Sequence, residues 1–309
     1  MEVIRQLKEN KGIVLALGYF DGMHLGHKKI IKTLVRSAQE KGLKSAVITF
    51  DKNPANFFND EQILNIQTFK DKELAIASLG VDYLYELNFE KIKDLTAQEY
   101  IENILVKYFE PKLIVVGYNH TFGKEKQGTS AYLSQEASKY GFETIIVPEQ
   151  KYEDNEKISS SLIRKRIQYG HLNAVKALLG RNFSVRNAVI KGNKKARALG
   201  YPTANIVWPE SMVKLPYGVY WGFCQTGSRL RPALISWGNK PTLTSGENEI
   251  LEAHIYDFDQ DLYGKIIKVV FVQKDRDIEN FGNIRVLATQ LQKDYTKFKE
   301  WAKKAFNSR

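Results

Sequence analysis

The first part of the chain alternates short apolar runs with segments whose apolar residues recur at helical spacing. The apolar runs predict strands at residues 12–17, 45–50, 82–87, 112–117 and 143–147. The spaced segments predict helices at residues 28–40, 69–79, 97–109 and 130–140. This alternation predicts a doubly wound parallel sheet covered on both faces, with ligands at the carboxyl ends of the strands.

The pattern changes after Gly180, where short strands with turn residues between them replace the helices. The expected strands lie at residues 183–191, 205–208, 218–226, 229–237, 250–256 and 265–273. A long helical pattern follows at residues 284–306. These elements predict a small antiparallel six-stranded β-barrel with a terminal helix. The length of 309 residues also favours two domains, which we place at residues 1–182 and 183–309.

Composition narrows the class of ligand and the compartment. The net charge of +11 favours anionic ligands, either nucleic acid or polyphosphate nucleotides. No Cys/His finger or RNA-binding aromatic motif accompanies the basic residues, so we expect small-molecule substrates, with a nucleic-acid binder as the alternative. The single cysteine, Cys224, favours a reducing cytoplasm. The first ten residues are polar and no apolar run approaches about 20 residues, so we expect neither a secretory signal nor a membrane partner.

Two histidines flank a glycine between the first predicted strand and its helix. His24 and His27 are three residues apart, so both imidazoles can face one side of the helix start. Unpaired N–H groups and partial positive charge at a helix N-terminus suit a phosphate. An ordinary helix cap is the alternative. A zinc pair is disfavoured, because no further ligands follow at the usual spacings.

Two other segments carry candidate phosphate chemistry. Ser159, Ser160 and Ser161 precede Arg164 by about one helical turn, which suits either helix capping or a phosphate clamp. Thr203 and Asn205 are two residues apart, so their oxygens share one side of an extended segment. Such neutral oxygens suit a Mg²⁺ ion that keeps waters and phosphate oxygens as its other ligands.

The wider string Gly18-Tyr19-Phe20-Asp21-Gly22-x-His24-x-Gly26-His27 resembles the nucleotidyltransferase signature of prokaryotic bifunctional riboflavin kinase/FMN adenylyltransferases, also called FAD synthetases. The resemblance implies that His24 and His27 are catalytic. It further implies ATP and phosphate contacts at Gly18, Phe20, Asp21, Gly26, Asn119, Ser159, Ser160, Ser161 and Arg164, and flavin contacts at Asn53 and Phe57.

The string Gly200-Tyr201-Pro202-Thr203-Ala204-Asn205 resembles the riboflavin kinase signature of the same family. The resemblance implies that Thr203 and Asn205 hold Mg²⁺ and that Gly192 and Gly200 contact ATP. It implies a catalytic carboxylate at Glu252 and a flavin contact at Arg276. Glu249 competes for the role of base, but its spacing of three residues places it on the opposite strand face.

These resemblances imply an enzyme that uses ATP twice. The second half would phosphorylate riboflavin to FMN, and the first would transfer AMP from ATP to FMN, giving FAD and pyrophosphate. Asn53, Asn119, Ala196 and Lys240 depart from the family pattern, so one weakened half is an alternative. Another H-x-G-H transferase, with a pantetheine, nicotinate or amino-acid substrate, is a further alternative. Oligomeric state is left open.

Overall fold

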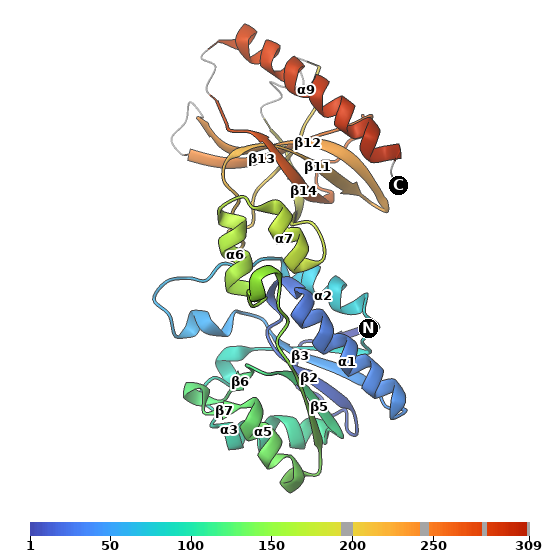
Figure 1. Cartoon of the computed structure of the whole chain (residues 1–309), viewed down its shortest axis with the longest axis vertical. Coiled ribbons are helices and arrows are strands. Elements are labelled where there is room, and N and C mark those ends of the chain that lie inside the picture. Colours follow the sequence, from blue (N-terminus) through green and yellow to red (C-terminus); the bar gives the residue numbers. More distant parts are fainter. Residues whose placement is uncertain (193–199, 242–246, 280–282, 308–309) are drawn as a thin grey trace. The chain divides into compact units, whose positions relative to one another are not determined.

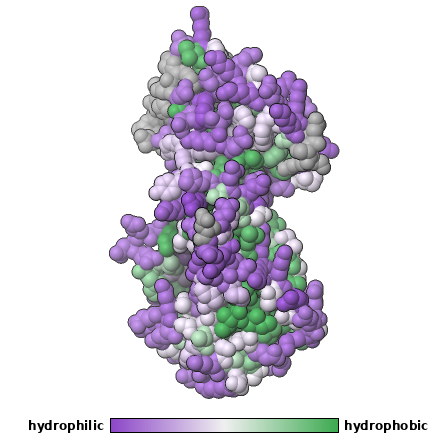
Figure 2. Space-filling model, in the orientation of Figure 1, coloured by the Kyte–Doolittle hydropathy of each residue, from purple (hydrophilic) through white to green (hydrophobic). Residues whose placement is uncertain are grey.

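The computed structural model describes residues 1–192, 200–241, 247–279 and 283–307. The chain forms two compact units, Met1–Leu162 and Ile163–Arg309 (Figure 1). Hydrophilic residues dominate the visible face of both units, with apolar residues in smaller groups (Figure 2). Such a surface is typical of a sequence in which 26% of the residues are charged.

The first unit is built on a six-stranded sheet in which every strand pair is parallel. The strand order is β1-β4-β3-β2-β5-β8. Their bounds are β1 Glu2–Ile4, β2 Val14–Leu17, β3 Ser45–Phe50, β4 Tyr83–Leu87, β5 Leu113–Gly117 and β8 Glu143–Val147. The predicted doubly wound sheet is therefore confirmed. Strand β1 and the small hairpin of β6 (Thr121–Phe122) and β7 (Gly128–Thr129) were not expected.

Helices cover both faces of this sheet because its strands are apolar on both sides. In β2, Val14 and Ala16 pack with α1 (Leu25–Glu40) and α2 (Phe69–Ala77) in one core. Leu15 and Leu17 belong to a second core on the other face. That core includes residues of α3 (Ala97–Tyr100), a π-helical stretch (Ile101–Val106), α4 (Lys107–Phe109) and α5 (Ser130–Glu136). The carboxyl end of β2 leads directly into α1, where the histidine pair lies.

The second unit contains a closed six-stranded barrel with strand order β10-β13-β12-β11-β14-β9. Each neighbouring strand pair among the described residues is antiparallel, which confirms the predicted barrel. The strands are β9 Ser184–Ile190, β10 Ala204–Ile206, β11 Gly218–Thr226, β12 Arg229–Pro241, β13 Glu247–Ile255 and β14 Ile266–Arg276. Helices α6 (Ser160–Gln168) and α7 (Leu172–Leu179) precede the barrel in the chain, and α9 (Ile284–Asn307) follows it.

Large aromatic side chains fill the barrel and attach its terminal helix. Trp237, Tyr220 and Phe271 are fully buried, and the rings of Tyr220 and Phe271 meet edge to face at 5.4 Å. On α9, the ring of Trp301 packs against Trp221 of the outer barrel wall, with ring centroids 6.0 Å apart. Helix α9 thereby covers this part of the outer wall. The polar residues Asn205 and Glu252 lie elsewhere, on β10 and β13.

Candidate active sites

A tight turn joins β2 to the histidine pair. Its backbone takes positive φ at Phe20 (56°), Gly22 (79°) and Met23 (42°). A Cβ at Gly22 would lie 2.9 Å from Ile66 Cδ1, so glycine is required there for space as well as for φ. The buried Asp21 carboxylate accepts from the Ile66 N–H at 2.9 Å. Asp21 therefore has a structural role in holding the turn.

His24 caps helix α1 and stacks on His27. The helix begins at Leu25, three residues earlier than predicted, so His27 lies in its first turn. His24 Nδ1 accepts from the His27 N–H at 3.3 Å, and the two rings stack with centroids 3.6 Å apart. Gly26 makes this possible, because a Cβ there would lie 3.1 Å from His24 Cε1. Both imidazoles thus lie together at an N-terminus with unpaired N–H groups.

Both imidazoles are held neutral by burial. Desolvation lowers the pKa of His24 to about 4. Burial, then the neighbouring charges of His24 and Lys72, lowers the pKa of His27 well below its usual value. His27 Nδ1 is buried and has no hydrogen-bond partner among the described residues. Since His24 Nδ1 accepts a hydrogen bond, the proton of its neutral ring is assigned to Nε2, which can donate to a ligand.

The three serines divide into different roles. Ser159 Oγ accepts from the Leu162 N–H at 3.2 Å and caps α6. Ser160 Oγ donates to the Asp21 carbonyl at 3.0 Å, which joins this segment to the histidine turn. Ser161 is exposed, and Arg164 follows one turn later on α6. The structure thus brings Ser160 to the turn before His24.

The predicted flavin residues of the first unit lie at the two ends of one short 3₁₀-helix. Asn53 caps a 3₁₀-helix, Pro54–Phe57, by accepting from the Ala55 N–H at 3.1 Å. The Phe57 ring packs against Phe89 at 5.2 Å. Asn119 is exposed in the loop after β5. These contacts show where the residues lie, and their part in binding stays a prediction.

Sequence reasoning missed Lys72, a lysine at a buried position of α2. Its side chain is 4% exposed, and Nζ donates to the Tyr19 carbonyl and to Thr49 Oγ1 at 3.1 Å each. Burial lowers the pKa of Lys72 to about 8, against the opposing charges of Asp21, Glu86 and Asp51. A signal was present, because Lys72 is three residues from Phe69 and four from the buried Ile76.

In the barrel, register brings the predicted kinase residues into one row. Asn205 of β10 lies opposite Glu252 of β13, and Glu252 lies opposite Ser236 of β12. Directly opposed residues share one face of a sheet, with their Cβ atoms about 5 Å apart. Leu251 and Ala253 are fully buried, so Glu252 lies on the outer face of the barrel. The row therefore sets a carboxylate beside an amide and a hydroxyl.

Asn205 sits in a close-fitting cradle. Its side chain is 6% exposed, and Nδ2 donates to the Thr203 carbonyl at 3.3 Å. A Cβ at Gly192 would lie 2.4 Å from that Nδ2, so only glycine leaves room for the amide. The Thr203 hydroxyl and the Asn205 amide oxygen are neutral donors that fit Mg²⁺ when phosphates supply other ligands. Among the described residues, no cluster of three His, Cys, Asp or Glu could bind a metal alone.

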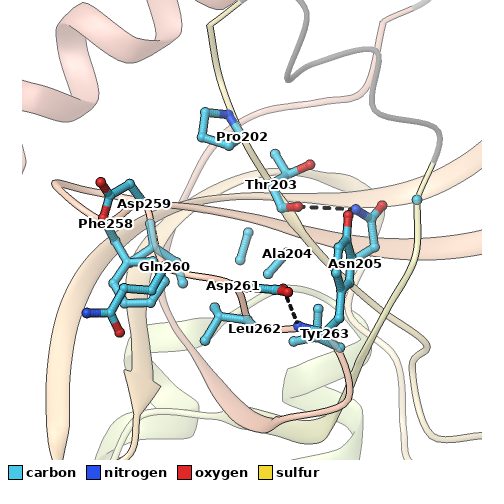
Figure 3. Close-up of a pocket in the computed structure, with 14 residues that line it drawn as sticks. Pro202, Thr203, Ala204, Asn205, Phe258, Asp259, Gln260, Asp261, Leu262 and Tyr263 are labelled. Atoms are coloured by element: carbon cyan, nitrogen blue, oxygen red, sulfur yellow. Dashed lines mark hydrogen bonds between the residues drawn. The ribbon is translucent and has the colours of Figure 1, made fainter.

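A cavity of about 320 Å³ adjoins this cradle. Thr203 and Asn205 line one side of it, and residues 258–263 line another (Figure 3). Asp261 Oδ1 accepts from the Tyr263 N–H at 2.9 Å and fixes that loop. The cavity is large enough for part of a nucleotide next to the proposed Mg²⁺ ligands.

Two charged residues near the row are already engaged. Glu249 forms an ion pair with Lys214 and accepts from the Tyr217 hydroxyl at 2.7 Å. Arg276 forms an ion pair with the buried Asp294 of α9 at 2.6 Å. Val219 of β11 lies opposite both Ser236 of β12 and Arg276 of β14, so Arg276 belongs to the same row across the sheet. Ala196 and the side chain of Lys240 lie outside the described residues.

The geometry of the two sites indicates a class of protein. The first unit has a parallel α/β sheet with two neutral imidazoles at a helix N-terminus, an arrangement that suits an anion. The barrel sets a carboxylate beside neutral oxygen ligands, as phosphoryl transfer requires. These two arrangements in one chain are typical of a two-domain transferase that acts on nucleotides.

Comparison with known proteins specifies the family. The chain matches the family model of FAD synthetase over residues 6–162 and that of riboflavin kinase over residues 179–302. A bifunctional riboflavin kinase/FMN adenylyltransferase of Bacillus subtilis is 32% identical, over 93% of this chain and 92% of that protein. The Escherichia coli protein of the same name is 31% identical, over 92% and 91%. The chain belongs to the family of bifunctional riboflavin kinase/FMN adenylyltransferases, which confirms the resemblance.

A solved structure supports the same architecture. A Streptococcus pneumoniae chain that bears the name macrolide-efflux protein is 32% identical, with a TM-score of 0.85. The match covers 97% of this chain and 100% of that one. Within residues 1–192, 200–241, 247–279 and 283–307, no helix of this chain could span a membrane.

Proposed function

We propose that this chain converts riboflavin to FAD in two ATP-dependent steps. Residues 183–309 phosphorylate riboflavin to FMN, and residues 1–182 transfer AMP from ATP to FMN. The observation that carries the proposal is the match of two family models, in this order, to two separately built sites. Riboflavin, FMN, ATP and FAD are the substrates and products that these two activities imply.

In the adenylyl transfer, a phosphate oxygen of FMN attacks the α-phosphorus of ATP and pyrophosphate leaves. The attacking phosphate is already an anion, so no base is needed. His24 and His27, as neutral imidazoles at the start of α1, stabilise the charge that builds on the α-phosphate oxygens. The leaving polyphosphate is held by Ser159, Ser160, Ser161 and Arg164, and the remaining ATP contacts come from Gly18, Phe20, Asp21, Gly26 and Asn119.

In the kinase step, Glu252 accepts the proton of a ribityl hydroxyl as that oxygen attacks the γ-phosphorus and ADP leaves. Asn205, which pairs with Glu252 on the neighbouring strand, and Thr203 would hold a Mg²⁺ ion together with the phosphates. When bound, Mg²⁺ supplies charge neutralisation on the phosphate oxygens. Gly192 and Gly200 let the backbone approach ATP. Flavin contacts are assigned to Asn53, Phe57 and Arg276.

The proposal extends to partners and compartment. The substrates are small molecules, with neither nucleic acid nor membrane as a partner. A cytoplasmic location accords with the single cysteine, Cys224, whose thiol is buried and whose pKa is raised to about 12 by that burial.

The test is product analysis of the wild-type chain with riboflavin, ATP and Mg²⁺. Chromatography of timed samples should show riboflavin consumed, FMN rising first, and FAD accumulating afterwards. Separate incubation with FMN and ATP should give FAD directly. A chain that leaves both riboflavin and FMN unchanged would overturn the proposal. A chain that converts only FMN would support the alternative of a weakened kinase half.

A further inference from the structure

Lys72 is a buried charged group that neither proposed reaction uses. Its ammonium lies 4.1 Å from the ring centroid of Tyr19 and 5.0 Å from that of Phe69. In the described part of the chain, no carboxylate forms an ion pair with it. A buried ammonium without an ion-pair partner is costly for the fold. The ammonium contacts the turn that leads to the histidine pair, which gives this position a functional reason.

The ammonium holds the carbonyl at which the strained turn begins. The Tyr19 carbonyl accepts from Lys72 Nζ at 3.1 Å and from Thr49 Oγ1 at 3.0 Å. Lys72 also donates to that same Thr49 hydroxyl at 3.1 Å, which closes a triangle of three hydrogen bonds. Thr49 is fully buried in β3, so the triangle ties the turn both to the sheet and to α2.

The next two carbonyls of the turn are held in the same way. Gln67 Nε2 donates to the Phe20 carbonyl at 3.5 Å, and Ser160 Oγ donates to the Asp21 carbonyl at 3.0 Å. Three consecutive carbonyls are therefore fixed by side chains from separate segments of the chain. Positive φ at non-glycine residues persists only where surrounding contacts enforce it. The contacts of this turn meet that requirement, and among the hydrogen bonds named here to the carbonyls of residues 19–21, Lys72 supplies the only charged donor.

The turn in turn sets the position of the imidazoles. The Phe20 ring meets the His27 ring edge-on, with centroids 5.3 Å apart. His24 follows the turn directly and caps α1. A shift of Tyr19 and Phe20 would therefore move the Phe20 ring, which packs against the His27 ring. The charge of Lys72 also reaches His27, since it helps to lower the pKa of that imidazole.

We propose that Lys72 is a positioning residue for adenylyl transfer, which fixes the turn at residues 19–21 so that His24 and His27 face the α-phosphate. This inference rests on the proposed function of the first unit. Lys72 acts through the turn and the imidazoles. Its loss should therefore lower the rate of adenylyl transfer more than it weakens the binding of ATP.

The first test replaces Lys72 with methionine, which keeps most of the buried stem and removes the ammonium. Lys72→Met should lower kcat for FAD formation from FMN about 100-fold, because small misplacements of catalytic groups cost that much. KM for ATP should stay within about threefold, as expected when ground-state binding is kept. Riboflavin phosphorylation by the same chain should be unchanged. Lys70→Met is the matched control, because Lys70 lies on the same helix with an exposed side chain.

Two further variants guard against a simple loss of folding. Lys72→Arg keeps a charged donor, so its kcat should be about tenfold higher than that of Lys72→Met. Thr49→Val removes the hydroxyl that bonds to both Lys72 and the Tyr19 carbonyl, so it should lower kcat about tenfold relative to wild type. A Lys72→Met chain with kcat within about twofold of wild type would overturn the inference. If Lys72→Met fails to fold, a folded Thr49→Val chain with normal kcat overturns it instead. A wild-type chain that never forms FAD overturns the proposed function itself, and this inference with it.

Discussion

Replacing Gly192 with alanine should impair riboflavin phosphorylation specifically. The added Cβ would lie 2.4 Å from Nδ2, 2.5 Å from Cγ and 2.6 Å from Oδ1 of Asn205. All three atoms of the amide would therefore be in collision. The φ of Gly192 is not in the left-handed region, so alanine meets no backbone strain. The whole effect should come from displacing the Asn205 amide.

Asn205 has little freedom to yield. Its backbone is paired on both sides, with Glu252 of β13 and Ile190 of β9. Overpacking of this kind costs about 1–3 kcal/mol. If that cost falls on the placement of Mg²⁺ and ATP, kcat/KM for riboflavin phosphorylation should fall about 5- to 150-fold, at about 1.4 kcal/mol per factor of ten.

The assay measures both half-reactions of the same variant. FMN adenylylation should be unchanged in Gly192→Ala. The Mg²⁺ concentration that gives half of the maximal kinase rate should rise. Gly227→Ala controls for a general effect of strain in the barrel, because Gly227 has a φ of +59° but a Cβ there meets nothing within 4 Å. Wild-type phosphorylation by a folded Gly192→Ala chain, or an equal loss of both activities, would refute the steric reasoning.

Two further predictions concern stability. His24 has a pKa of about 4 when folded and about 6.5 when unfolded, so the unfolded state binds more protons as pH falls from 6.5 to 4. The free energy of unfolding should therefore drop by about 2 kcal/mol between pH 8 and pH 5 from His24 alone. Urea titrations of the first unit's transition measure this, and equal midpoints would contradict it. Asp294→Asn should destabilise the barrel by about 3–5 kcal/mol, because it removes the buried carboxylate that forms an ion pair with Arg276. Thermal unfolding measures this loss, and an unchanged barrel transition would show that the ion pair contributes little.

Much of the fold was predictable because its elements are long and strongly patterned. Strand β2 reads as a continuous apolar run because it is buried on both faces. Strand β1 has three residues, too few for any periodicity to show. Helix α1 begins earlier than expected because its cap is His24, which is not a common capping residue. The π-helical stretch Ile101–Val106 keeps nearly the same apolar spacing as an α-helix and left no separate signal.

The candidate sites were predictable as motifs but not as geometry. The residues Thr203 and Asn205 come from one short string, whereas Glu252 lies 47 positions later than Asn205. Only the register between β10 and β13 shows that Asn205 and Glu252 are neighbours. Lys72 was missed because a lysine in a helical pattern is normally a solvent-exposed residue. Its spacing from Phe69 and Ile76 placed it on the apolar face of α2, but the contacts with Tyr19 and Thr49 that accompany its burial come from distant parts of the sequence.

The central claim is that one chain carries two independent phosphate sites. The most direct measurement is the rate of each half-reaction in His27→Ala and in Glu252→Ala. The account predicts that His27→Ala still turns riboflavin into FMN but forms no FAD, while Glu252→Ala adenylylates FMN normally but no longer phosphorylates riboflavin. If either substitution lowered both rates to the same degree in a folded protein, the claim of two independent sites would be contradicted.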